Sequence, residues 1–150
     1  MRPLRPGALA AVLLMATVAL PALGQDFRSI AEPAAILYDA PSTKAKRMWV
    51  LGRGYPVQVT VAIEGWSKVR DATGELSWVE NRALSSARTV LVRAATASVR
   101  ETAADASPVV LRVARDVVLD LVEPPSGDWV RVRHRDGVTG FIHANQVFGL

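Results

Sequence analysis

The chain has 150 residues, of which 50% are hydrophobic and 21% are charged, with 18 basic residues against 14 acidic ones. This hydrophobic fraction is enough to bury a core, so the chain is not a disordered tail. The absence of cysteine excludes disulfides, thiol nucleophiles and a lipid-modified N-terminal cysteine. Basic and acidic residues are interspersed, as on a solvated surface.

Residues 1–24 have the three parts of a secretory signal peptide. These are the positive start at Arg2 and Arg5, the apolar run Ala8 to Leu20, and small residues at Ala22-Leu23-Gly24. The run is short for a transmembrane helix, which needs roughly 20 residues; an uncleaved anchor is the alternative. We expect cleavage before Gln25 and a periplasmic or secreted protein with no membrane insertion afterwards.

Cleavage would remove two of the 18 basic residues and no acidic residue, which leaves a net charge of +2. So small a charge does not favour a nucleic-acid partner. The next segment, residues 25–34, is expected to be a flexible lead-in. It is followed by an apolar run from Ala35 and a short strand at 48–51. A half-buried strand at 55–61 comes next, with its inward side formed by Tyr55, Val57, Val59 and Val61.

One stretch occurs twice, as WSKVRDATGELSWV at Trp66–Val79 and as WVRVRHRDGVTGFI at Trp129–Ile142. Four identities and three conservative pairs over fourteen ungapped positions indicate an internal repeat. Between the copies, we expect a helical turn at 80–84 and strands at 89–92, 109–113 and 117–122. The offset between equivalent residues changes from 62 to 63 in the turn at 124–128.

Each copy is expected to form a hairpin with a three-residue turn that ends in glycine, Gly74 or Gly137. Glycine fits the left-handed conformation that such a turn needs. This register places Val132 opposite Gly140 and leaves aromatic and basic residues on the outward face. A two-residue turn, which would bury Phe141, is the alternative. The outward residues are Trp66, Lys68, Arg70 and Trp78 in the first copy and Trp129, Arg131, Phe141 and His143 in the second.

Short strands at regular spacing with turn signals indicate an all-β fold of small sandwiches or barrels. The expected domains are residues 35–87 and 88–150. Each has only about 60 residues and would be marginally stable alone. We therefore expect the two domains to pack on one another and to unfold together.

The sequence resembles the bacterial SH3-like (SH3b) family, as two tandem copies. The motifs that carry the resemblance are ILYDAP at Ile36–Pro41, EGWSKVR at Glu64–Arg70, GELSWV at Gly74–Val79 and DWVRVRHRDGVTGFI at Asp128–Ile142. The resemblance implies two SH3-like small β-barrels and a binding module for the cell wall or envelope. In eukaryotic SH3 domains a tyrosine and a tryptophan, here Tyr38 and Trp66 or Trp129, line a polyproline groove. The proline and tyrosine that complete this groove are absent, which argues against a polyproline ligand.

Residues suited to catalysis are few. The only two histidines, His134 and His143, point to opposite faces of the second hairpin in the expected register, so they cannot share a metal ion. No serine triad, acid pair or glycine-rich phosphate loop is evident. We therefore expect no enzyme activity, no metal and no cofactor.

The outward faces lead to two hypotheses. Either the tryptophans are packing residues covered by arginine stems, or at least one face binds a ligand, because tryptophan beside arginine is typical of interface hot spots. The partner would be peptidoglycan, a wall peptide or an envelope protein; the alternative function is that of an accessory subunit regulating an envelope enzyme. The candidate ligand-binding residues are Tyr38, Trp66, Lys68, Arg70, Trp78, Trp129, Arg131, Phe141 and His143.

Overall fold

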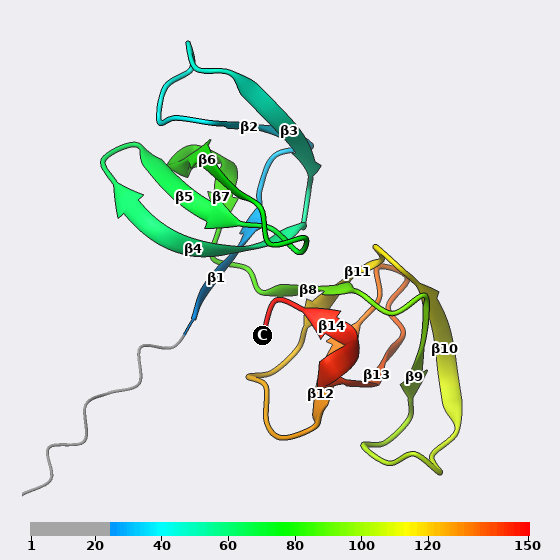
Figure 1. Cartoon of the computed structure of the whole chain (residues 1–150). Coiled ribbons are helices and arrows are strands. Elements are labelled where there is room, and N and C mark those ends of the chain that lie inside the picture. Colours follow the sequence, from blue (N-terminus) through cyan, green and yellow to red (C-terminus); the bar gives the residue numbers. More distant parts are fainter. Residues whose placement is uncertain (1–24) are drawn as a thin grey trace, which may run out of the picture.

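The structure, a computed structural model, describes residues 25–150 and consists of two similar modules, each built on a seven-stranded antiparallel sheet (Figure 1). The predicted signal peptide, residues 1–24, lies outside the described residues. Within the described range, no helix is long and apolar enough to cross a membrane.

The first module has the strand order β3-β2-β6-β5-β4-β1-β7. Its elements are β1 (Asp26–Ile30), β2 (Ala34–Tyr38), β3 (Arg47–Gly52), β4 (Pro56–Ile63), β5 (Trp66–Arg70), β6 (Leu76–Glu80), the 3-10 helix η1 (Asn81–Ala83) and β7 (Leu84–Ser85). The helical turn that the sequence predicts after β6 is thus present as η1.

The second module has the order β10-β9-β13-β12-β11-β8-β14, the same arrangement position by position. Its elements are β8 (Thr89–Val92), β9 (Thr96–Arg100), β10 (Val109–Ala114), β11 (Val118–Leu121), β12 (Trp129–Arg133), β13 (Thr139–His143), η2 (Ala144–Gln146) and β14 (Val147–Phe148). The repeat therefore extends beyond the hairpin to the whole module.

The expectation of a flexible lead-in at residues 25–34 is wrong. Strand β1 lies between β4 and β7, with Arg28 paired to Val57 and Ile30 paired to Leu84. Ile30 is only 1% exposed and belongs to the core. Strand β1 occupies in the first sheet the place that β8 has in the second. It is ordered because its backbone groups pair on both sides and its apolar side chains are buried.

The expectation of closed barrels also needs correction, because both sheets are open. In the first module β3 and β7 are the edge strands, and no pairing joins them; β10 and β14 are the unpaired edges of the second. The last strand of each module has only two residues. So short a strand has few backbone groups left for pairing with a second neighbour.

Both central hairpins have the predicted three-residue turns. Val132 pairs with Gly140 and Val130 with Ile142, so the alternative register that would bury Phe141 is excluded. Gly137 has φ +95°, and Gly74, in the equivalent turn, has φ +93°. The predicted division of inward and outward residues in both hairpins follows from this register.

Each module has its own core of aliphatic side chains beneath the hairpin. In the first module Val57 and Val69 are fully buried, but Val61 is 44% exposed, contrary to the expectation that it faces inward. The pairing of β4 with β5 shifts between Val59 and Val61, which is the signature of a β-bulge. One extra residue reverses the side on which the following side chains lie.

The two modules touch where the turn before β4 meets β8 and where β1 meets β14. Gly54 precedes β4, and the equivalent position before β11 is Asp116; both have positive φ. The Thr89 hydroxyl donates a hydrogen bond to the Gly54 carbonyl oxygen at 2.6 Å. The rings of Phe27 and Phe148 meet edge to face, with centroids 5.4 Å apart. The modules are therefore in direct contact, as the short connection between them led us to expect.

Candidate functional site

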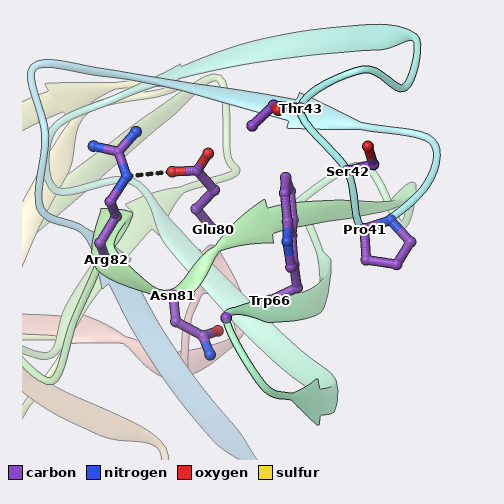
Figure 2. Close-up of a pocket in the computed structure, with 8 residues that line it drawn as sticks. Pro41, Ser42, Thr43, Trp66, Glu80, Asn81 and Arg82 are labelled. Atoms are coloured by element: carbon purple, nitrogen blue, oxygen red, sulfur yellow. Dashed lines mark hydrogen bonds and ion pairs between the residues drawn. The ribbon is translucent and has the colours of Figure 1, made fainter.

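The best candidate site is an open hollow around Trp66 in the first module (Figure 2). It has a volume of about 500 Å³ and lies between the loop after β2, the start of β5 and η1. Figure 2 shows the Trp66 ring standing between Glu80 on one side and Pro41 and Ser42 on the other. The lining residues are Pro41, Ser42, Thr43, Gly65, Trp66, Glu80, Asn81 and Arg82.

Local backbone structure places Trp66 at the start of β5. The preceding Gly65 has φ +77°, which allows the tight turn from β4. Trp66 then pairs with Glu80 on β6, on the face opposite to the buried Ser67 and Val69. The Tyr38 ring packs edge to face against the indole at 5.5 Å between centroids. Because Tyr38 is only 6% exposed, it supports the tryptophan rather than offering surface of its own.

Asn81 holds one wall of the hollow in place. Its side-chain oxygen accepts a hydrogen bond from the Ser67 hydroxyl at 2.6 Å, and its amide donates to the Ile63 carbonyl oxygen at 3.2 Å. Its backbone N–H donates to the Gly65 carbonyl oxygen at 2.9 Å. These bonds tie η1 to both sides of the turn that carries Trp66, so the wall and the indole keep a fixed relation.

The adjacent wall carries charge of both signs. Arg82 is paired with Glu80 and also with Glu32, at 3.1 Å. The hydrogen bond and the charge of Glu80, followed by the charge of Glu32, raise the pKa of Arg82 above its ordinary value. Its side chain remains 73% exposed. The site thus presents a positive guanidinium, a carboxylate and a flat apolar ring within one hollow.

The other predicted residues of the first module lie outside this hollow. Trp78 pairs with Lys68 and with Tyr38, and the Lys68 ammonium is 6.0 Å from the centre of the Trp78 ring. Arg70 is exposed beside Leu76 at the far end of the hairpin. The structure therefore places Tyr38, Trp78 and Lys68 side by side on three neighbouring strands, with Trp66 in contact with Tyr38. Arg70 is separated from the Trp66 hollow.

On the equivalent surface of the second module, a neighbouring side chain stacks on the tryptophan, which remains partly exposed. The His143 imidazole stacks on Trp129, with centroids 3.8 Å apart and an angle of 30° between the planes. The His143 Nε2 atom lies 2.8 Å from Asp105 Oδ1. Asp105 belongs to the loop at 101–108, which Arg100 also holds by donating to the Ser107 carbonyl oxygen at 2.8 Å. The histidine thus covers one face of Trp129, and the loop contacts the histidine through Asp105.

Two further predicted residues of the second module pair across the same face. Arg131 pairs with Phe141 in the register of the hairpin and lies 3.8 Å from a Glu123 oxygen. The four predicted outward residues of this copy are therefore neighbours, but their contacts are with one another and with nearby loops. This arrangement favours the packing hypothesis for the second copy.

Groups for catalysis are scattered in the part of the chain that the structure describes. His134 contacts Asp136 at 2.9 Å at the hairpin tip, far along the strand from the contact of His143 with Asp105. Across residues 25–150, no three histidine or carboxylate side chains gather as a metal site would require. No hydroxyl of a described residue is hydrogen-bonded to either histidine.

Seven of the eight lining residues were not predicted as site residues from the sequence: Pro41, Ser42, Thr43, Gly65, Glu80, Asn81 and Arg82. Pro41 ends the ILYDAP motif, and Asn81 and Arg82 lie in the predicted helical turn. The sequence patterns therefore included these residues but did not indicate that they line a site. Their meeting at Trp66 depends on pairing between β2 and β6, which are 38 or more positions apart. Such a long-range contact has no local sequence pattern.

Comparison with known families gives a match over most of the chain. The family model of the bacterial SH3 domain matches twice, over residues 31–86 and 93–149. No curated protein matches the sequence.

Three solved structures are similar in part. NlpC2 from Trichomonas vaginalis is 16% identical with a TM-score of 0.38, over 84% of this chain and 48% of that protein. NlpC1 from the same organism is 17% identical with a TM-score of 0.39, over 95% and 51% of the two chains. An NlpC/P60 family protein from Bacillus cereus is 17% identical with a TM-score of 0.39, over 82% and 56%. This chain spans about half the length of each of these proteins.

Proposed function

Because the chain belongs to the bacterial SH3 domain family, we propose that it is a non-catalytic binding module of the cell envelope and that the Trp66 hollow is its ligand site. The family resemblance implies ligands of the wall or envelope. The signal-peptide pattern of residues 1–24 supports a periplasmic or secreted location. No nucleic acid, metal or cofactor is part of the proposal.

The observation that carries this proposal is the difference between the two tryptophans. Trp129 is covered by a stacked imidazole, whereas Trp66 lines an open hollow. An indole that is held rigidly by a buried ring beneath it and still faces solvent is typical of a binding hot spot. Trp66 has such support from Tyr38.

The polar walls favour a short peptide as ligand. Arg82 can donate to a carboxylate, Glu80 can accept from an amine, and the hydroxyls of Ser42 and Thr43 can bond to amide groups. The indole and Pro41 would contact an aliphatic side chain. Wall peptides carry carboxylates, amides and small aliphatic groups, so we propose peptidoglycan peptides as the ligand.

A protein partner is the second candidate, and one feature of the first module favours it. Trp49 is 43% exposed and Val50 is 64% exposed on β3, an edge strand of the open sheet. Exposed apolar side chains beside unpaired backbone groups are suited to contact with another protein. In this case the chain would be an accessory subunit that regulates an envelope enzyme.

The test is co-sedimentation of the protein starting at Gln25 with purified peptidoglycan sacculi, beside a pull-down from a periplasmic extract. We expect binding to sacculi, and Trp66→Ala should weaken it by about 2 kcal/mol, a factor of roughly thirty. Trp129→Ala is the matched control, because it removes the same side chain from the second copy, where His143 stacks on it; its binding should stay within about twofold.

Circular dichroism must show that both variants keep the fold. Equal binding by Trp66→Ala and the unchanged protein would contradict the assignment of the site. Retention of one periplasmic protein without binding to sacculi would favour the accessory subunit instead.

A further inference from the structure

A second hollow lies where the two modules meet, and it shares no residue with the Trp66 hollow. Its volume is about 690 Å³. The first module contributes Arg53 and Gly54 from the turn between β3 and β4. The second contributes β11 and the tip of the β12–β13 hairpin, including Arg133, His134 and Arg135. We call this hollow the inter-module cleft.

Contacts between the modules give the cleft a defined floor. The hydroxyl of Thr89, which is only 6% exposed, donates to the Gly54 carbonyl oxygen at 2.6 Å. A side chain at Gly54 would meet the Val118 Cγ1 atom at 3.3 Å, which shows how closely the two modules approach. Both modules are therefore needed to form the cleft, and their relative position sets its shape.

Basic groups outnumber acidic groups in the cleft. Arg133 is paired with Asp120 at 3.1 Å, so these two charges balance each other. Asp116 is the other carboxylate that lines the cleft, against two more guanidinium groups, those of Arg53 and Arg135. Within residues 25–150, neither of these arginines has an acidic partner within 4.0 Å.

The guanidinium group is suited to oxyanions. It is planar, stays charged and presents paired N–H donors that match the geometry of carboxylate and phosphate. A concave site with a few convergent polar groups is the usual setting for a small ligand. Arg53 and Arg135 come from different modules, and the paired Arg133 lies on the strand that leads to Arg135.

We propose that the inter-module cleft binds an oxyanion, the carboxylate or phosphate of a small ligand, between Arg53 of the first module and Arg135 of the second. The bound group would bridge the two modules. It would therefore stabilise their docked arrangement as well as occupy a site separate from the Trp66 hollow.

The test is a titration of the ¹⁵N-labelled protein with inorganic phosphate and, separately, with glutarate, at constant ionic strength. Saturable changes are expected at the amides of Gly54, Thr89 and Arg135. Arg53→Gln and Arg135→Gln should each raise the dissociation constant by roughly fivefold, less than for a buried ion pair because the cleft is open to water. Phosphate or glutarate, whichever binds, should raise the melting temperature of the unchanged protein. The rise should be smaller for Arg53→Gln and for Arg135→Gln.

Two controls separate a site from general attraction of anions. Arg47→Gln and Arg112→Gln remove the same charge from strands β3 and β10, outside the cleft, and should change the dissociation constant less than about twofold. Trp66→Ala should leave phosphate binding unchanged, so a failure of the proposed function would not affect this result. Saturation by one probe alone identifies the preferred oxyanion. Changes that do not saturate with either probe, or equal losses in the controls, would overturn the proposal.

Discussion

Replacing Gly140 by alanine should destabilise the second module strongly. Gly140 lies on β13 opposite Val132, where β13 passes β9. A Cβ atom at this position would lie 2.5 Å from the Arg100 carbonyl oxygen and 2.7 Å from Val99 Cγ1. The first is a backbone atom of a paired strand, so β9 itself would have to move.

The magnitude follows from the packing of the core. Overpacking a filled site costs about 1–3 kcal/mol, and we expect the upper end, because Val99 is only 1% exposed and backbone must move. For the 126 residues from Gln25 onward, 1 kcal/mol corresponds to a shift of about 3–5 °C in the melting temperature. Gly140→Ala should therefore lower the melting temperature by about 10 °C.

The first module provides the matched control. Ser77 occupies the equivalent position on β6, so a Cβ atom is already accommodated there. Its hydroxyl is buried without a hydrogen-bond partner among the described residues. Ser77→Ala removes an unsatisfied polar group, and the melting temperature should stay the same or rise by a few degrees. Thermal unfolding followed by circular dichroism measures both changes. A loss below about 2 °C for Gly140→Ala would show that β9 and β13 are not as close as described.

Two further predictions concern the Asp136 carboxyl group and the stability of the first module alone. The Asp136 carboxylate accepts a hydrogen bond from the Val138 N–H and contacts His134, and these contacts hold its pKa below the ordinary value. The resulting stabilisation is present above the unfolded-state pKa of about 3.9 and is lost as the pH falls through the folded-state pKa. A carboxyl NMR titration with a midpoint at or above about 3.9 would contradict this. A fragment of residues 25–87 should fold poorly, because it lacks the contact of Phe27 with Phe148; a fragment with the melting temperature of the whole protein would show that the modules fold independently.

Local patterns predicted the hairpins well, because the information they need is local. The glycine in each turn and the alternation of valine with polar residues in WVRVR determine the register within fourteen positions. The structure has that register, including the pairing of Val132 with Gly140. The all-β class was predicted for the same reason, whereas the predicted closure of the sheets into barrels was wrong.

Features that depend on distant partners were missed. Strand β1 has the mixed sequence DFRSI, and its partners β4 and β7 begin 30 and 58 positions after it. The bulge that turns Val61 outward is likewise a property of the pair β4–β5 and not of either strand alone. The candidate site contains residues of both kinds, those predicted from local sequence and those brought in by distant partners. Trp66 was identified from its motif, whereas Arg82 joins it only because of the folded arrangement of β6 and η1.

The stacking of His143 on Trp129 affects the number of ligands that one chain can hold. Trp66 and Trp129 are equivalent, but His143 stands where Glu80 stands in the first copy, and it stacks on its tryptophan and contacts Asp105. Under the proposed function the chain is therefore monovalent for its envelope ligand, despite its two modules. A monovalent binder gains no avidity from a repeated polymer such as peptidoglycan. It would exchange rapidly along that polymer and could not cross-link two strands of it.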